Sequence, residues 1–221
     1  MKYKLGILGG MSPSATCSMY QRIIDHTVAS CDQEHIKMVI LNDCDTPDRT
    51  KALLENGENP LPYLNKGIET LIGLGCEYFV IPCNTAHAYA DHFLMQDRIK
   101  FISMITEVEK ELETKYSNKR ICVLCTWGTR NTKIYENNNL SIFYPTNQQK
   151  VMDVITNTKA GISGLDALQE VVDEEKDYDI FLLACTELSL YKDLLKTDKI
   201  IIDAMDVLVR ATIESCGKQY K

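Results

Sequence analysis

Two cysteines stand at matching places in the two halves of the chain. Cys83 follows an apolar run with the pattern of a β-strand, and Cys185 follows a second such run. Small polar residues that can cap a helix come next, Asn84 and Thr85 after the first cysteine and Thr186 after the second. A thiol at the start of a helix is favoured as the thiolate, because the helix dipole and the free amides stabilise negative charge.

Two thiols on opposite sides of one bound carbon could act in turn as a base and an acid. The thiolate would take the α-proton and the thiol would deliver a proton to the far face, which inverts a stereocentre. The neighbouring amide and hydroxyl groups could hold a carboxylate. Two other interpretations stay open from spacing alone: both cysteines are small buried core residues, or His87 activates Cys83 in a hydrolase, which leaves Cys185 without a role.

The rest of the chain alternates strand and helix patterns, as the placing of the two thiols requires. Strand patterns cover residues 5–8, 37–41, 77–82, 99–104, 121–125, 140–144, 180–184 and 199–202. Helix patterns begin near residues 13 and 86, end near residue 135, and cover residues 62–74, 106–115, 148–157, 164–175, 187–195 and 204–215. This alternation predicts parallel sheets covered by helices on both faces.

The pattern begins again near residue 118, which indicates two similar units. We therefore predict an α/β protein of two similar domains, each a mostly parallel sheet flanked by helices, with the active site in the cleft between them. The first domain comprises residues 1–105 and 204–221 and carries Cys83. The second comprises residues 106–203 and carries Cys185.

Other polar or flexible residues follow the ends of strands, where open α/β sheets bind their ligands. Met11 lies in a glycine-rich turn after the first strand, and Thr126 follows the strand that opens the second half. Arg49 ends a polar loop after the second strand, where its guanidinium could fork onto a carboxylate. The alternative is a solvated arginine that pairs with Asp45 or Asp48.

Composition excludes several classes of partner. The 221 residues are enough for a real core. The net charge of −7 and the lack of a basic patch argue against nucleic-acid binding. No apolar run is long enough to span a bilayer, and residues 5–8 are too short for a signal peptide. We therefore expect a cytoplasmic protein with reduced thiols and no membrane contact.

The nine cysteines and four histidines do not form a metal-binding pattern. Cys122 and Cys125 are spaced as CxxC but lie inside a strand pattern, where residues three apart point to opposite faces. His87 and His92 are five residues apart rather than the four that place two ligands on one helix face. We expect no metal site.

Several motifs together resemble one protein family. They are residues 6–13 (GILGGMSP), 32–35 (DQEH), 47–50 (PDRT), 82–87 (PCNTAH), 159–161 (KAG) and 185–187 (CTE). In this order they are highly specific, and the sequence is identified as a member of the aspartate/glutamate racemase family, similar to its aspartate branch over nearly the whole chain. The fold implied by the resemblance is the pair of α/β domains predicted above.

The resemblance also implies an activity and its residues. The activity is interconversion of L- and D-aspartate without pyridoxal phosphate, metal or other cofactor, in an enzyme that is a homodimer. Cys83 and Cys185 match the two catalytic cysteines. The residues matched to substrate binding are Met11, Arg49, Asn84, Thr85, Thr126, Thr129, Lys159 and Thr186. Among them, Arg49 and Lys159 are the cations expected near the carboxylates.

The sequence departs from the family pattern at a few places. Ser12 replaces the second glycine of the usual Gly-Met-Gly-Pro turn, and Glu187 stands where glutamate racemases carry a histidine. The aspartate–serine pair of glutamate racemases after the first strand is also missing, and these absences favour aspartate. Action on glutamate, hydantoins or maleate stays open as an alternative, as does a non-catalytic sensor of acidic amino acids. The roles of His87 and Glu187 also stay open.

Overall fold

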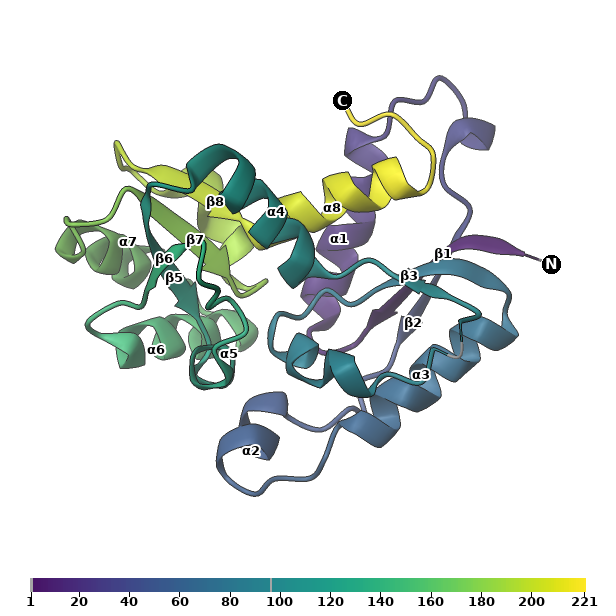
Figure 1. Cartoon of the computed structure of the whole chain (residues 1–221), viewed down its shortest axis with the longest axis horizontal. Helices are drawn as coiled ribbons and strands as arrows, with labels where there is room; N and C mark the ends of the chain where they lie inside the picture. Colours follow the sequence, from purple (N-terminus) through teal and green to yellow (C-terminus); the bar gives the residue numbers. More distant parts are fainter. Residues whose placement is uncertain (1, 96) are drawn as a thin grey trace.

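The computed structural model describes residues 2–95 and 97–221; Met1 and Gln96, both within the predicted first domain, lie outside the described residues. Within this range the strands form two four-stranded sheets, one in each half of the chain, and all their pairings are parallel (Figure 1). This confirms the predicted α/β fold of two similar units. None of the helices in the described part of the chain is long and apolar enough to cross a membrane.

The first sheet has the strand order β2-β1-β3-β4 and the second has the order β6-β5-β7-β8. Their strands are β1 (Tyr3–Gly9), β2 (Met38–Asn42), β3 (Cys76–Val80), β4 (Lys100–Phe101), β5 (Arg120–Cys125), β6 (Ser141–Phe143), β7 (Ile180–Ala184) and β8 (Ile200–Asp203). The α-helices are α1 (Pro13–His26), α2 (Arg49–Leu54), α3 (Leu61–Gly73), α4 (Met104–Tyr116), α5 (Trp127–Thr132), α6 (Gln148–Lys159), α7 (Leu165–Glu174) and α8 (Ala204–Ser215). Short 3₁₀ helices are η1 (Asp32–Glu34), η2 (Thr85–His92) and η3 (Leu188–Leu194).

Continuous apolar runs form the central strands because helices cover both faces of each sheet. Every residue of β7 is buried, and so is every residue of β5 after Arg120. Cys122 and Cys125 lie in different core clusters on opposite faces of β5, as their spacing predicts. Burial raises the pKa of both thiols.

The register of the strands places the predicted site residues at one edge of each sheet. Cys125 pairs with Ala184 at the ends of β5 and β7, so Thr126 and Cys185 emerge side by side. In the first sheet β1 lies between β2 and β3, which places the turns after all three strands at a common edge. The two edges therefore supply the two sides of one site.

Helices α1, α4 and α8 join the two sheets. Helix α8 packs against both α1 and α4, and Figure 1 shows α4 and α8 side by side between the sheets. Arg22 of α1 donates to Asp203 at the end of β8 over 2.7 Å, and Asp203 is buried. The proposed domain boundaries fall close to the starts of α4 and α8, and the exact division stays a prediction.

Some predicted elements differ from the structure. The segments after Cys83 and Cys185 form 3₁₀ helices rather than α-helices, and neither begins with a side-chain cap. The polar loop around residue 49 contains α2, because Asp48 accepts a hydrogen bond from the Lys51 amide and caps a helix there. The strand predicted over residues 99–104 is confined to β4, because Ser103 already caps α4.

The helix predicted to end near residue 135 stops earlier. Helix α5 ends at Thr132, and Lys133 takes a left-handed conformation with φ 56°. The chain thus turns before Tyr135, which is fully buried.

Candidate active site

Two cavities lie where the edges of the two sheets face each other. The outer cavity has a volume of about 400 Å³ and is lined by the start of α1, the loop before α2, the end of α6 and the start of η3. The inner cavity has a volume of about 20 Å³ and is lined by both Cys83 and Cys185. Six residues line both cavities: Met11, Asp48, Arg49, Lys159, Thr186 and Glu187.

The structure brings most of the predicted site residues together. Those that line the inner cavity are Met11, Arg49, Cys83, Asn84, Thr85, Thr126, Lys159, Cys185 and Thr186. Thr129 is the exception, since it is fully buried behind the cavity wall. Its position makes it a support for the neighbouring threonines rather than a group that faces a ligand.

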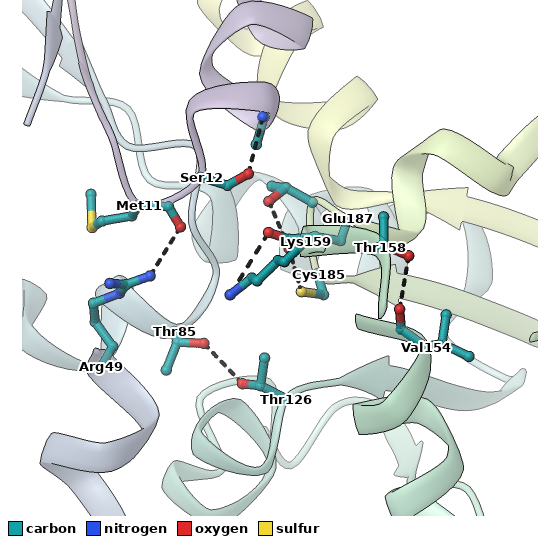
Figure 2. A network of polar contacts seen from close by, with 12 residues as sticks. Met11, Ser12, Arg49, Thr85, Thr126, Val154, Thr158, Lys159, Cys185 and Glu187 are labelled. Atoms are coloured by element: carbon teal, nitrogen blue, oxygen red, sulfur yellow. Dashed lines mark hydrogen bonds and ion pairs between the residues drawn. The ribbon is translucent and has the colours of Figure 1, made fainter. Parts of the chain in front are cut away.

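Cys185 is buried and its thiol has a carboxylate partner. Its Sγ donates to Oε2 of Glu187 over 2.9 Å (Figure 2). Burial and the negative charge of Glu187 raise the pKa of Cys185, although the ammonium group of Lys159 opposes this. The expectation that the local backbone favours the thiolate is therefore wrong for Cys185, because burial and the carboxylate of Glu187 outweigh the favourable Glu187 backbone amide and the charge of Lys159.

Cys83 is held through its backbone by His87. Nδ1 of His87 lies 2.9 Å from the Cys83 carbonyl oxygen, and Nε2 accepts a hydrogen bond from the Met104 amide over 3.0 Å. Burial lowers the pKa of His87 to about 4, so the neutral ring donates from Nδ1. Because both ring nitrogens are occupied, His87 positions Cys83 against the start of α4 and does not activate its thiol.

Three threonine hydroxyls connect the two sheets beneath the inner cavity. Oγ1 of Thr85 lies 2.9 Å from that of Thr126 (Figure 2). It also lies 3.1 Å from Oγ1 of Thr129. Thr126 also caps α5, since its hydroxyl accepts from the Thr129 amide. A Cβ added to Gly128 would lie 2.7 Å from the Thr85 methyl group, so glycine permits this close approach.

Asn84 does not cap a helix but faces the inner cavity. Its Oδ1 accepts a short hydrogen bond from the buried hydroxyl of Tyr135. Its Nδ2 is buried and has no hydrogen-bond partner among the described residues. The amide N–H groups are therefore available to a ligand.

Arg49 is a buried cation without an anionic partner in the described part of the chain. Its guanidinium donates to the carbonyl oxygen of Met11 over 3.0 Å (Figure 2). It also donates to the carbonyl oxygen of Pro47 over 3.0 Å. No carboxylate of the described residues pairs with it, so the alternative pairing with Asp45 or Asp48 is wrong. A buried charge held only by neutral groups favours the binding of an anion.

Lys159 is the second cation of the site and ends α6. Its Nζ lies 3.8 Å from Oε1 of Glu187, and its side chain is 42% exposed (Figure 2). Burial is the largest single effect and opposes the charged form of Lys159, but the negative charges of Glu187, Cys185 and Cys83 together outweigh it and raise the pKa of Lys159. A partly exposed ammonium group on both cavities can turn from Glu187 to a ligand.

The turn between β1 and α1 forms another wall of the outer cavity. Gly10 has φ +89°, and an added Cβ would lie 2.2 Å from the backbone carbonyl of Asp43. Ser12, which replaces a glycine of the family pattern, accepts from the Ala15 amide over 3.3 Å and caps α1. The start of α1 thus lines the outer cavity, and a helix N-terminus is an environment that favours an anion.

Sequence reasoning missed two contacts in this site. Tyr135 reaches Asn84 from a distant part of the chain, and no local pattern marks such a contact. Glu187 was noted without a role, although its position two residues after Cys185 is compatible with a contact between the two side chains.

Comparison with known proteins decides the family. A family model described as Asp/Glu/Hydantoin racemase matches residues 8–212. The chain belongs to the Asp/Glu/hydantoin racemase family. The resemblance seen in the motifs is thus confirmed, and with it the assignment of this racemase-family chain as an isomerase.

Individual relatives agree with that assignment. The aspartate racemase of Picrophilus torridus is 31% identical, with a TM-score of 0.88 over 99% of this chain and 96% of that chain. The broad-specificity amino-acid racemase RacX of Bacillus subtilis is 26% identical over 96% of this chain and 97% of its own length. A glutamate racemase of Francisella tularensis, solved with D-glutamate, shares the fold, with 17% identity and a TM-score of 0.69 over 96% of this chain and 80% of that chain.

Proposed function

We propose that this racemase interconverts L- and D-aspartate, with Cys83 and Cys185 as its two acid–base groups. One observation carries the proposal: a thiol from each sheet lines the same inner cavity. A non-catalytic sensor of acidic amino acids would have no need of two thiols there.

In this mechanism the α-carbon of the substrate lies between the two sulfur atoms. A thiolate takes the α-proton, and the opposite thiol delivers a proton to the other face. The carbanion is stabilised by fixed donors, and the unpartnered Nδ2 of Asn84 and the hydroxyls of Thr85 and Thr126 lie on the same cavity. The inner cavity has room for about one water molecule, which favours strong electrostatic effects once substrate displaces it.

The choice of aspartate rests on the two cations. Arg49 and Lys159 line the same cavities, and aspartate has two carboxylates to pair with them. Arg49 has no carboxylate partner within the described residues, so it can take one substrate carboxylate without breaking an ion pair. The similarity to an aspartate racemase of known structure supports this substrate.

Broader specificity is the second candidate, because the outer cavity is larger than aspartate requires. Its volume of about 400 Å³ leaves room for longer side chains. The similarity to a broad-specificity amino-acid racemase supports the same extension.

Exchange of the α-proton in deuterated water tests the reaction and the substrate together. We expect deuterium on the α-carbon of both enantiomers of aspartate, by proton NMR, and the loss of racemisation in Cys83→Ala and in Cys185→Ala. Cys17→Ala is the matched control, because Cys17 is exposed on α1 and lines neither cavity. Racemisation at the wild-type rate in either active-site variant would contradict the two-thiol mechanism, and tight aspartate binding without exchange would indicate a sensor.

The same panel separates the substrates. Glutamate, alanine and asparagine enantiomers should be compared with aspartate at equal concentration. We also propose that the enzyme is a homodimer, which light scattering coupled to size-exclusion chromatography would check.

A further inference from the structure

The two thiols of the inner cavity have different surroundings. Cys185 donates from Sγ to Oε2 of Glu187 over 2.9 Å. No hydrogen bond to Sγ of Cys83 occurs among the described residues, and the hydrogen bond from His87 to Cys83 goes to the backbone carbonyl oxygen rather than to the thiol. One thiol thus has a built-in proton acceptor and the other does not.

Glu187 is placed as a base rather than as a structural group. It is buried, with 6% of its surface exposed, yet its Oε1 has no hydrogen-bond partner among the described residues. Oε2 accepts from Cys185 and, over 3.3 Å, from the hydroxyl of Thr186. A carboxylate that served only the fold would satisfy both of its oxygens, because unpartnered buried oxygens are costly.

Lys159 supplies the compensating charge. Its Nζ lies 3.8 Å from the unpartnered Oε1, beyond hydrogen-bond distance. The pair therefore stabilises negative charge on Glu187 without blocking either oxygen. Lys159 is the only cation within ion-pair distance of Glu187 among the described residues.

We propose that Glu187 is the proton acceptor for Cys185, so that the resting enzyme holds Cys185 as the thiol and ionises it through this carboxylate. This inference rests on the proposed two-thiol function. The S–H bond breaks and an O–H bond forms at Oε2 of Glu187. The thiolate then takes the α-proton of the enantiomer that faces it, and the Cys83 thiol gives its own proton to the carbanion.

The cycle closes without another reagent. Glu187 lines the outer cavity as well as the inner one, so it returns its proton to solvent there. In the opposite direction Cys185 starts as the thiol and donates directly to the carbanion, after which Glu187 and solvent restore its proton. Cys83 has no such relay and exchanges its proton with water in the cavity.

Single-cysteine backgrounds separate the two thiols. Each retains one sulfur, which can remove and return hydrogen on one face and so exchange one enantiomer without racemising it. Cys83→Ala should exchange the enantiomer that faces Cys185, and Cys185→Ala the other. In the Cys83→Ala background, adding Glu187→Gln should lower the exchange rate by at least about 100-fold, the usual contribution of a general base.

The matched measurement uses the other background. In Cys185→Ala, adding Glu187→Gln should change the exchange of the opposite enantiomer by less than about threefold, since the two sites are then independent. Glu187→Asp keeps the charge one carbon further away and should recover part of the lost rate in the Cys83→Ala background. It also provides the test if the glutamine variant does not fold.

The outcomes are distinct. If neither single-cysteine enzyme exchanges either enantiomer, the proposed two-thiol function fails. If each exchanges one enantiomer but Glu187→Gln lowers both rates equally, Glu187 is structural and the inference is overturned. An unchanged rate in the Cys83→Ala background overturns it as well.

Discussion

Acid should destabilise this protein through His87 in a way that a single substitution reveals. Burial lowers the pKa of His87 to about 4, against 6.5 for the free side chain. Above about pH 6.5 the ring is neutral in the folded and unfolded states, and its titration has no effect on stability. Between pH 6.5 and pH 4 the imidazole of the unfolded chain binds a proton that His87 of the folded chain does not bind. The free energy of unfolding therefore falls as the pH falls through this range.

The magnitude follows from the difference in pKa. Each unit is worth about 1.4 kcal/mol, so the free energy of unfolding loses about 3 kcal/mol once the pH is below 4. About 2.5 kcal/mol of this is lost by pH 4.5. The main physical cause is burial, which disfavours the charged imidazolium. A proton on Nε2 would also leave the Met104 amide without its acceptor.

Urea unfolding of the wild type and of His87→Gln at about pH 7.5, 6.5, 5.5 and 4.5 isolates this contribution. The glutamine amide can replace both ring contacts but does not titrate. At neutral pH we expect the variant to be less stable by about 1 kcal/mol. The difference should reverse in sign near pH 6, because only the wild type loses the His87 contribution, while the effects of the other titrating groups are the same in both proteins and cancel. A difference that stays constant from pH 7.5 to 4.5 would refute a buried neutral His87.

Three other substitutions test the contacts that hold the site. Gly128→Ala would place a methyl group 3.2 Å from the backbone of Thr50, so we expect about 1–3 kcal/mol of destabilisation in urea and a lower kcat. Tyr135→Phe removes the hydroxyl that orients Asn84, so kcat/KM should fall about tenfold in the wild-type background but much less when Asn84→Ala is already present; additive losses would contradict the coupling. Arg49→Lys cannot reproduce the planar fork, so KM for aspartate should rise at least about tenfold, while an unchanged KM would remove Arg49 from carboxylate binding.

The fold was predictable because its determinants are local. Buried parallel strands such as β5 and β7 appear in the sequence as continuous apolar runs, and the alternation with helices then restricts the topology. Errors came where one side chain decides an element boundary. Asp48 begins α2 as its cap, and Ser103 ends β4 by starting α4, and neither effect depends on hydrophobic pattern.

The site was predictable to the extent that strand ends converge on one edge. That rule places Cys83, Cys185 and Thr126 together, and the structure has them on one cavity. It does not specify how each side chain is oriented. Lys159 lies at the end of a helix, where local sequence indicates only a surface lysine, and it was identified through the family resemblance alone.

The two halves repeat one arrangement of strand, thiol and short helix, but the residues after each thiol have different partners. After Cys83, the Asn84 side chain accepts a hydrogen bond from Tyr135, and His87 donates one to the Cys83 carbonyl oxygen. These two side chains therefore hold the segment that carries the thiol. After Cys185, the Glu187 carboxylate instead accepts a hydrogen bond from the thiol itself. A racemase must remove a proton from either face of its substrate, and in the proposed mechanism the similar folds of the two halves supply one thiol for each face. Under the proposed two-thiol mechanism, these unequal surroundings mean that the two thiols are ionised by different routes, so the chemical symmetry of the reaction does not require a symmetrical site.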